Sequence, residues 1–100
     1  MRLAFTIGTV TLVEPHPAMR GGPLRVLVPL SSGDVAGVAT GRAGPADLAA
    51  EPLVAWDDLG CGDGQLVAFS EGGEAAQPFD PLDKPIDAYV AAIIDRLETT

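Results

Sequence analysis

"RLAFTIGTVTLV", residues 2–13, decides the fold because it stays largely apolar on both faces when it is extended. Successive residues of a strand point to opposite sides. One face carries Leu3, Phe5, Ile7, Thr9, Thr11 and Val13, and the other carries Arg2, Ala4, Thr6, Gly8, Val10 and Leu12. A strand of this kind is buried on both sides. We therefore expect it inside a barrel or sandwich, or against a neighbouring subunit.

The same stretch has the outline of a weak signal peptide, with Arg2 before an apolar run and Ala18 near a cleavage point. Gly8 and three threonines interrupt that run, and the β-branched alternation favours a strand. No segment approaches the roughly 18 apolar residues of a membrane span. We expect no membrane partner.

Three further segments favour short strands, namely "LRVLVPL" (24–30), "EPLVAW" (51–56) and "QLVAF" (65–69). Pro29 has no amide hydrogen to donate, so it marks an edge or the end of its strand. The stretch between the first two is rich in Gly and Ala, and 45–50 can form one helical turn.

The end of the chain changes character at Pro85. A proline in the first turn, the negative charge of Asp87 and good helix formers predict a short helix through "IDAYVAA", and "IIDRL" (93–97) predicts a last strand. The fold class is therefore mainly β, a small five-stranded barrel with one short α-helix near the C-terminus. At 100 residues we expect a single domain over 1–100.

Charge and composition exclude several classes of partner. Six basic residues stand against 14 acidic ones, and the net charge of -8 repels phosphate backbones and anionic membranes. Aromatic residues, which stack on bases, are only 5% of the chain. We therefore expect no nucleic-acid partner. A single cysteine allows no internal disulfide, so the cytoplasm is the expected compartment.

The stretch "DDLGCGDGQLV", residues 57–67, concentrates glycines around the only cysteine. Phosphate-binding loops need other glycine spacings, and the P-loop also needs a Lys and a Ser or Thr. In this stretch a strand follows the glycines, and three aspartates repel phosphate. A structural zinc site needs about four Cys or His ligands, and the chain has only Cys61 and His16. We expect neither cofactor nor metal in this stretch.

Cys61 is also a poor nucleophile. Its thiolate needs a base, the one histidine lies on a distant loop, and the flanking aspartates raise the pKa of the thiol. We expect no catalytic residues. The glycines instead permit a sharp turn or close packing against another copy, with Cys61 as a small apolar residue.

Three stretches together resemble the bacterial microcompartment vertex protein family, whose pentameric shell proteins occur in carboxysomes and ethanolamine-utilisation compartments. They are "MRLAFTIGTV", the glycine stretch from Asp57 to Val67, and "KPIDAYVAAIID", residues 84–95. Cys61 stands where the family has Ala, Gln65 stands where it has Glu, and "GGEAAQ" replaces a Ser-Ala-Arg segment.

The resemblance implies a barrel of the oligonucleotide-binding type that assembles into a homopentamer and caps the vertices of a microcompartment shell beside hexameric shell proteins. It implies a structural, non-enzymatic role in the cytoplasm. We expect the axial loop of the ring to comprise Gly60, Cys61, Gly62, Asp63 and Gly64, with five Asp63 side chains as an acidic collar. The other motif or interface residues are Asp57, Gln65, Lys84, Pro85 and Asp87.

One alternative stays open beside this resemblance. The acidic stretch "FDPLDKPID" brings Asp80, Asp83 and Asp87 close together, although their spacing differs from that of a calcium-binding EF-hand loop. The chain would then be a small acidic barrel that binds a ligand or a metal. Calcium and zinc binding discriminate between the two hypotheses.

Overall fold

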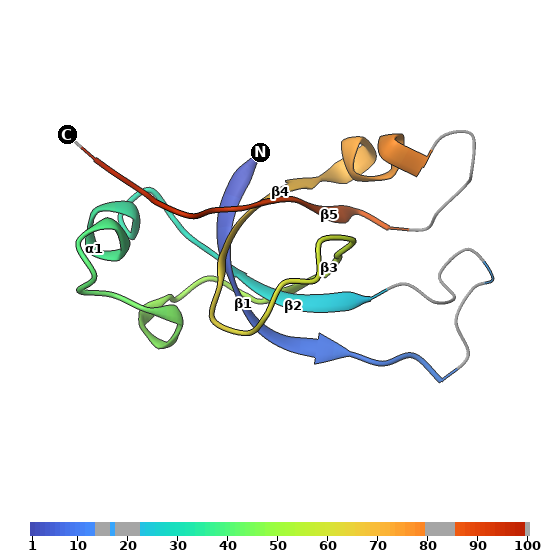
Figure 1. Cartoon of the computed structure of the whole chain (residues 1–100), viewed down its shortest axis with the longest axis horizontal. Helices are drawn as coiled ribbons and strands as arrows, with labels where there is room; N and C mark the ends of the chain where they lie inside the picture. The colour runs from blue at the N-terminus through green and yellow to red at the C-terminus, as the bar shows by residue number, and fades with distance from the viewer. Residues whose placement is uncertain (14–16, 18–22, 80–85, 100) are drawn as a thin grey trace.

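Five strands form a closed barrel in the computed structural model, which describes residues 1–13, 17, 23–79 and 86–99 (Figure 1). The strands are β1 (Arg2–Val10), β2 (Leu24–Pro29), β3 (Leu53–Trp56), β4 (Leu66–Glu71) and β5 (Ala88–Ile93). Their order around the barrel is β1-β2-β3-β5-β4. The predicted mainly β, five-stranded barrel is confirmed. Among the described residues, no helix is long and apolar enough to cross a membrane.

Strand β1 lies between β2 and β4 and is buried on both faces along its first half. Ala4 and Thr6 point into the barrel and are fully enclosed, while Phe5 points outward and is 9% exposed. A register shift between Thr6 and Gly8 interrupts the pairing with β2, and pairing with β4 ends at Phe5. The expected strand is therefore real, but it stops at Val10 rather than at residue 13.

Two apolar clusters stabilise the barrel, one inside it and one on its outer face. The inner cluster comprises Ala4, Leu27, Ala55, Cys61, Val67, Phe69, Ala88 and Val90. The outer cluster is built on Phe5, Val28 and Leu30, with Leu3, Val35, Val38, Leu48 and Leu66 packed against it. Burial of apolar side chains at these two places is the main stabilising contribution to the fold.

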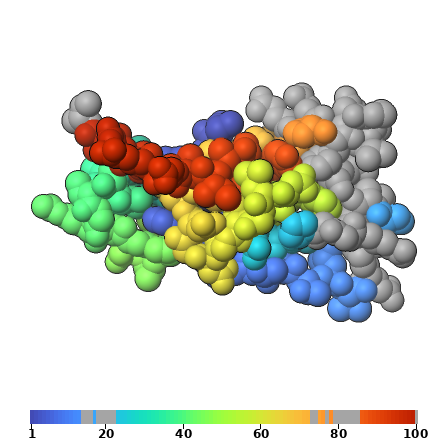
Figure 2. Space-filling model, viewed as in Figure 1, coloured from blue at the N-terminus to red at the C-terminus, as the bar shows by residue number. Residues whose placement is uncertain are grey.

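The outer cluster is covered by the segment that joins β2 to β3. This segment holds a short helix, α1 (Val35–Ala39), and a 3-10 turn, η2 (Pro45–Asp47) (green in Figure 2). The turn that begins at Pro45 was predicted, but α1 was not. Asp34, just before α1, stabilises the turn that precedes the helix, because its carboxylate accepts hydrogen bonds from the amide and hydroxyl of Ser31, both at 2.8 Å.

The predicted C-terminal helix is wrong, because Ala88–Ile93 forms strand β5. Five of its residues pair with β4, and the alternate residues Ala88 and Val90 are buried in the core. This pairing and burial outweigh the helix propensity of the alanines. The predicted strand over 93–97 is wrong as well, because the last pair with β4 is Val67 with Ile93. Strand β5 ends at Ile93, and one further hydrogen bond joins the amide of Ile94 to the carbonyl of Leu66 at 2.8 Å.

Strand β5 lies between β3 and β4, which are consecutive in the chain but do not pair with each other. Its pairing with β4 is antiparallel and extends over five residue pairs. Its pairing with β3 is parallel, and the described register consists of one pair, Trp56 with Tyr89. The segment after β4 contains a 3-10 helix, η3 (Gly72–Phe79), whose Ala75 is fully buried.

Candidate functional site

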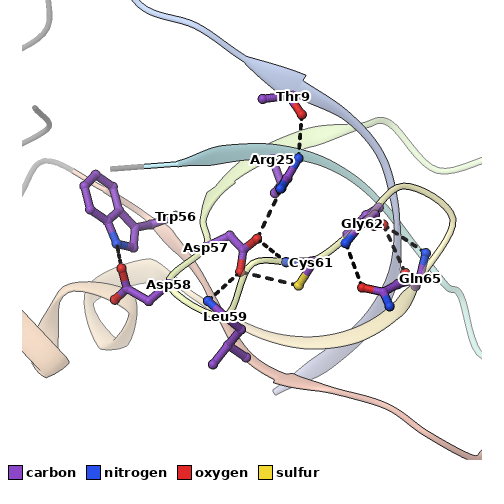
Figure 3. A network of polar contacts seen from close by, with 10 residues as sticks. Thr9, Arg25, Trp56, Asp57, Asp58, Leu59, Cys61, Gly62 and Gln65 are labelled. Atoms are coloured by element: carbon purple, nitrogen blue, oxygen red, sulfur yellow. Dashed lines mark hydrogen bonds and ion pairs between the residues drawn. The ribbon is translucent and has the colours of Figure 1, made fainter. Parts of the chain in front are cut away.

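The turn from Asp57 to Gln65 joins β3 to β4 and is organised around a buried carboxylate (Figure 3). The side chain of Asp57 is fully enclosed. Its Oδ1 accepts the amide hydrogen of Leu59 at 2.9 Å and the thiol hydrogen of Cys61 at 3.4 Å. Its Oδ2 accepts the amide hydrogen of Cys61 at 2.8 Å. The carboxylate therefore fixes the backbone of the first half of the turn.

Arg25 of β2 provides the opposite charge. Its Nε donates to Oδ2 of Asp57 at 3.2 Å, and its Nη1 donates to the hydroxyl of Thr9 on β1 at 2.6 Å. The Arg25 side chain is 19% exposed, so water screens this ion pair only in part. The arrangement links β1, β2 and the turn after β3 through one carboxylate.

The surroundings of Asp57 favour its charged form. Burial alone raises the pKa of this carboxyl, but the amides of Cys61 and Leu59, the Arg25 side chain and the Cys61 thiol all donate hydrogen bonds to it. These donors outweigh the loss of solvation, and the pKa of Asp57 lies below its ordinary value of 3.8. Asp57 is thus ionised across the physiological range and acts as a structural anion.

Cys61 belongs to the inner core and is fully buried. Burial, followed by the hydrogen bond and the charge of Asp57, raises the pKa of its thiol to about 11. The thiolate that a nucleophile or a metal ligand requires is therefore disfavoured. The expectation that Cys61 acts as a small apolar residue with a raised pKa is confirmed.

A second set of hydrogen bonds fixes the other half of the turn. The hydroxyl of Thr6, fully buried on β1, donates to the carbonyl of Gly62 and accepts the amide hydrogen of Gln65 at 3.0 Å. The amide oxygen of the Gln65 side chain accepts the amide hydrogen of Gly62 at 2.8 Å. Backbone bonds join Thr6 to Gly64 and Gln65 at 2.7 and 2.9 Å.

The glycines of the turn have different roles. Gly60 and Gly64 have φ angles of +74° and +76°, a region that side chains with a Cβ rarely adopt. Gly62 has no such angle, and a Cβ there would lie 3.9 Å from the Gln65 side chain, which is ordinary contact. The predicted sharp turn is confirmed, and two of its three glycines are required by their backbone conformation.

The remaining residues that the sequence singled out do not join this network. Asp63 is exposed at the tip of the turn, and Asp87 is exposed just before β5. Lys84 and Pro85 lie outside the described residues, as do His16, Asp80 and Asp83 of the alternative hypotheses. Within the described part of the chain, no group of three Cys, His, Asp or Glu residues could hold a metal ion.

Sequence reasoning missed two residues that hold the turn. Arg25 carried a signal, because it is a charge inside an apolar strand and such a charge requires a partner. Its partner is 32 residues away, and the spacing did not identify it. Thr6 carried a weaker signal, as a hydroxyl on the face that holds Ala4.

Comparison with known proteins places this barrel in a family. Residues 1–95 match the family model described as "Ethanolamine utilisation protein EutN/carboxysome". The match spans the barrel strands and the complete turn from Asp57 to Gln65.

The chain belongs to this family.

Two relatives carry names that describe a shell. This chain is 34% identical over 97 residues to the carboxysome shell vertex protein CcmL of Thermosynechococcus vestitus. The match covers 97% of this chain and 86% of that protein. It is 31% identical over 98 residues to the bacterial microcompartment shell vertex protein PduN of Salmonella typhimurium, covering 97% and 98% of the two chains.

A solved structure matches along the whole chain. It is GrpN of Rhodospirillum rubrum, a pentameric microcompartment shell protein, with a TM-score of 0.76, 28% identity and complete coverage of both chains. The sequence resemblance to the vertex protein family is therefore confirmed.

Proposed function

We propose that this protein assembles as a homopentamer and caps the vertices of a bacterial microcompartment shell in the cytoplasm. The observation that carries the proposal is the 34% identity, over nearly the whole chain, to a protein named for its place at the vertex of the carboxysome shell. The pentameric GrpN supports the number of copies. The chain acts as one domain that supplies shape and closure, with hexameric shell proteins as its neighbours.

The chemistry of the described residues supports a structural role rather than catalysis. The buried carboxylate and the thiol, which are the two groups most suited to chemistry, are enclosed and bonded to each other. Both hold a turn in place and neither reaches solvent. We therefore propose that the protein is not an enzyme.

Native mass spectrometry tests the assembly directly. The expected species has five times the 10.2 kDa mass of one chain. A stable monomer or dimer at micromolar concentration contradicts the proposal. Co-expression with hexameric shell proteins tests the vertex role, since closed shells should form with this chain and open or elongated shells without it.

We also propose that the turn tip at Asp63 borders the axis of the ring. The support is that Asp63 is exposed at the tip, while Cys61 in the same turn faces the core. Five carboxylates there would form an acidic collar that favours cations over anions in any opening. The enclosed Asp57 cannot take part, because its own chain surrounds it.

Spin labels test the placement of Asp63. A label on Asp63→Cys should give short distances between copies, and a label on Thr40→Cys, beside α1, should give long ones. The buried thiol of Cys61 does not compete for the label. Long distances at residue 63 in an intact pentamer defeat the axial placement and leave the vertex role standing.

A further inference from the structure

The outer face of β1, β2 and β3 is apolar along its length. Register pairs place Gly8 beside Val26 and Val26 beside Val54, which form one row across the three strands. The next row on the same face consists of Val10, Leu24 and Trp56. Neither row contains a charged residue. Such a face has to be covered by another apolar surface.

The chain covers both sides of the first row but not the row itself. On one side, Phe5 and Val28 lie under Val35, Val38 and Leu48 of the α1 segment. On the other side, Leu24 and Trp56 are each 5% exposed. Val54 remains 44% exposed between them, Val26 is half-buried, and Gly8 has no side chain. We call Gly8, Val26 and Val54 the outer strip.

A second apolar surface lies where β1 runs past the barrel. Strand β1 has no pairing with β4 beyond Phe5 in the described register, and its second half pairs with β2 alone (Figure 1). The chain that follows exposes Leu12 by 42% and Val13 by 96%. We call this pair the arm tip.

A ring of five copies requires two different surfaces on each subunit. In a cyclic assembly with more than two members, one surface of each subunit contacts a different surface of the next. The outer strip and the arm tip are two such surfaces, and both consist of uncharged apolar side chains. Charge also favours contact there. Each copy carries a net charge of -8, so the electrostatic repulsion between two copies is weakest where their surfaces carry no carboxylates.

We infer that the arm tip of one copy packs on the outer strip of the next copy around the ring. This inference rests on the proposed homopentamer and assigns its interface. The missing side chain at Gly8 leaves room beside Val26 and Val54 for the incoming Leu12 and Val13. The occupant of the strip is therefore a second copy of this chain.

Two substitutions in the strip should weaken assembly without unfolding the chain. Val54→Glu places a charge in the contact. Gly8→Val fills the strip. Its Cβ would lie 3.7 Å from the Val26 side chain, which is ordinary contact, at an ordinary φ angle, and a β-branched side chain suits a strand. Each should raise the protein concentration at half-assembly about tenfold or more, with little change in the thermal midpoint of the dissociated chain.

Ile93→Glu is the matched control, because Ile93 is exposed to nearly the same extent, 41%, and lies outside the strip. Native mass spectrometry over a dilution series should show this variant assembling like the parent. Parent-like assembly of Val54→Glu overturns the inference, and so does equal weakening by Ile93→Glu. A parent chain that forms no pentamer contradicts the proposed function itself.

Disulfide trapping tests the pairing of the two surfaces. Val54→Cys and Val13→Cys are prepared as separate chains, mixed and oxidised, and the buried Cys61 thiol stays out of the reaction. The mixture should give crosslinked dimers of unlike chains in higher yield than either variant alone. Equal yields, or preferred crosslinking of Val13→Cys to a Thr40→Cys control chain, overturn the assignment of the arm tip to the strip.

Discussion

Asp57 and Cys61 are joined twice, by the amide of Cys61 to Oδ2 at 2.8 Å and by its thiol to Oδ1 at 3.4 Å. The carboxylate stabilises the turn, and the cysteine fills the core beneath it. This pairing explains why the glycine stretch around Cys61, which looks reactive in the sequence, has its thiol and carboxylate buried in the structure.

Replacing Asp57 by Asn should destabilise the fold strongly. The substitution keeps the shape but removes the charge that pairs with Arg25, and it turns one acceptor oxygen into a donor that faces other donors. We expect the free energy of unfolding to fall by about 2–4 kcal/mol in urea titrations. The matched change in the same turn, Asp63→Asn, should shift it by less than about 0.5 kcal/mol. Similar effects of the two variants contradict the structural role of Asp57.

The pH dependence of stability should carry the signature of Asp57. Its pKa is lowered on folding, so its contribution is complete above the unfolded value near 3.8 and is lost as pH falls through the folded value. Between about pH 7 and about pH 2, the parent should therefore lose more stability than Asp57→Asn. Asp34, whose pKa is also lowered by hydrogen bonds from Ser31, acts in the same direction in both proteins. Parallel pH profiles of the two proteins contradict this assignment.

The thiol of Cys61 should be unreactive in the folded protein. It is fully buried and its pKa is about 11, so a thiol reagent near pH 8 should modify it only after denaturant is added. Cys61→Ala should cost about 1 kcal/mol of stability through a small cavity and should leave the pentamer intact. Rapid labelling of the native protein is the result that contradicts this burial.

Alanine substitutions should separate the three glycines of the turn. Gly60→Ala and Gly64→Ala should each lower the free energy of unfolding by about 1–2 kcal/mol, because both positions have a left-handed φ. A clash does not contribute, since the space around both positions is open. Gly62→Ala serves as the control and should change stability by less than about 0.5 kcal/mol. Thermal melts of the three variants measure the difference, and a uniform loss would point to crowding by neighbours instead.

The sequence predicted the strands whose apolar residues set them apart from the surrounding loops. The stretch from Arg2 to Val13 indicated a strand buried on both sides, and the inner and outer clusters account for that pattern in its first half. Pro29 ends its strand as expected. The helix assigned after Pro85 failed because alanines favour a helix locally, whereas the burial of Ala88 and Val90 depends on β4, about 20 residues earlier in the chain.

The turn from Asp57 to Gln65 was predicted from the sequence, but the contacts that hold it in place were not. The glycine stretch was identified as a turn, and the weak nucleophilicity of Cys61 followed from its neighbours. The ion pair of Asp57 with Arg25 depends on β2 and β3 lying side by side. Residues that meet through sheet register are not related by any short spacing, so the sequence alone did not bring these two together.

The position of β5 determines when the protein can fold. This strand follows the others in the chain yet lies between β3 and β4. While the chain is being synthesised, β1 to β4 emerge first and leave a gap that only residues 88–93 can fill. The core residues on either side of that gap, Ala55 and Phe69, have no β5 neighbour until then. Barrel closure is therefore a late event in synthesis, and the ring can assemble only from chains that have already been translated through β5.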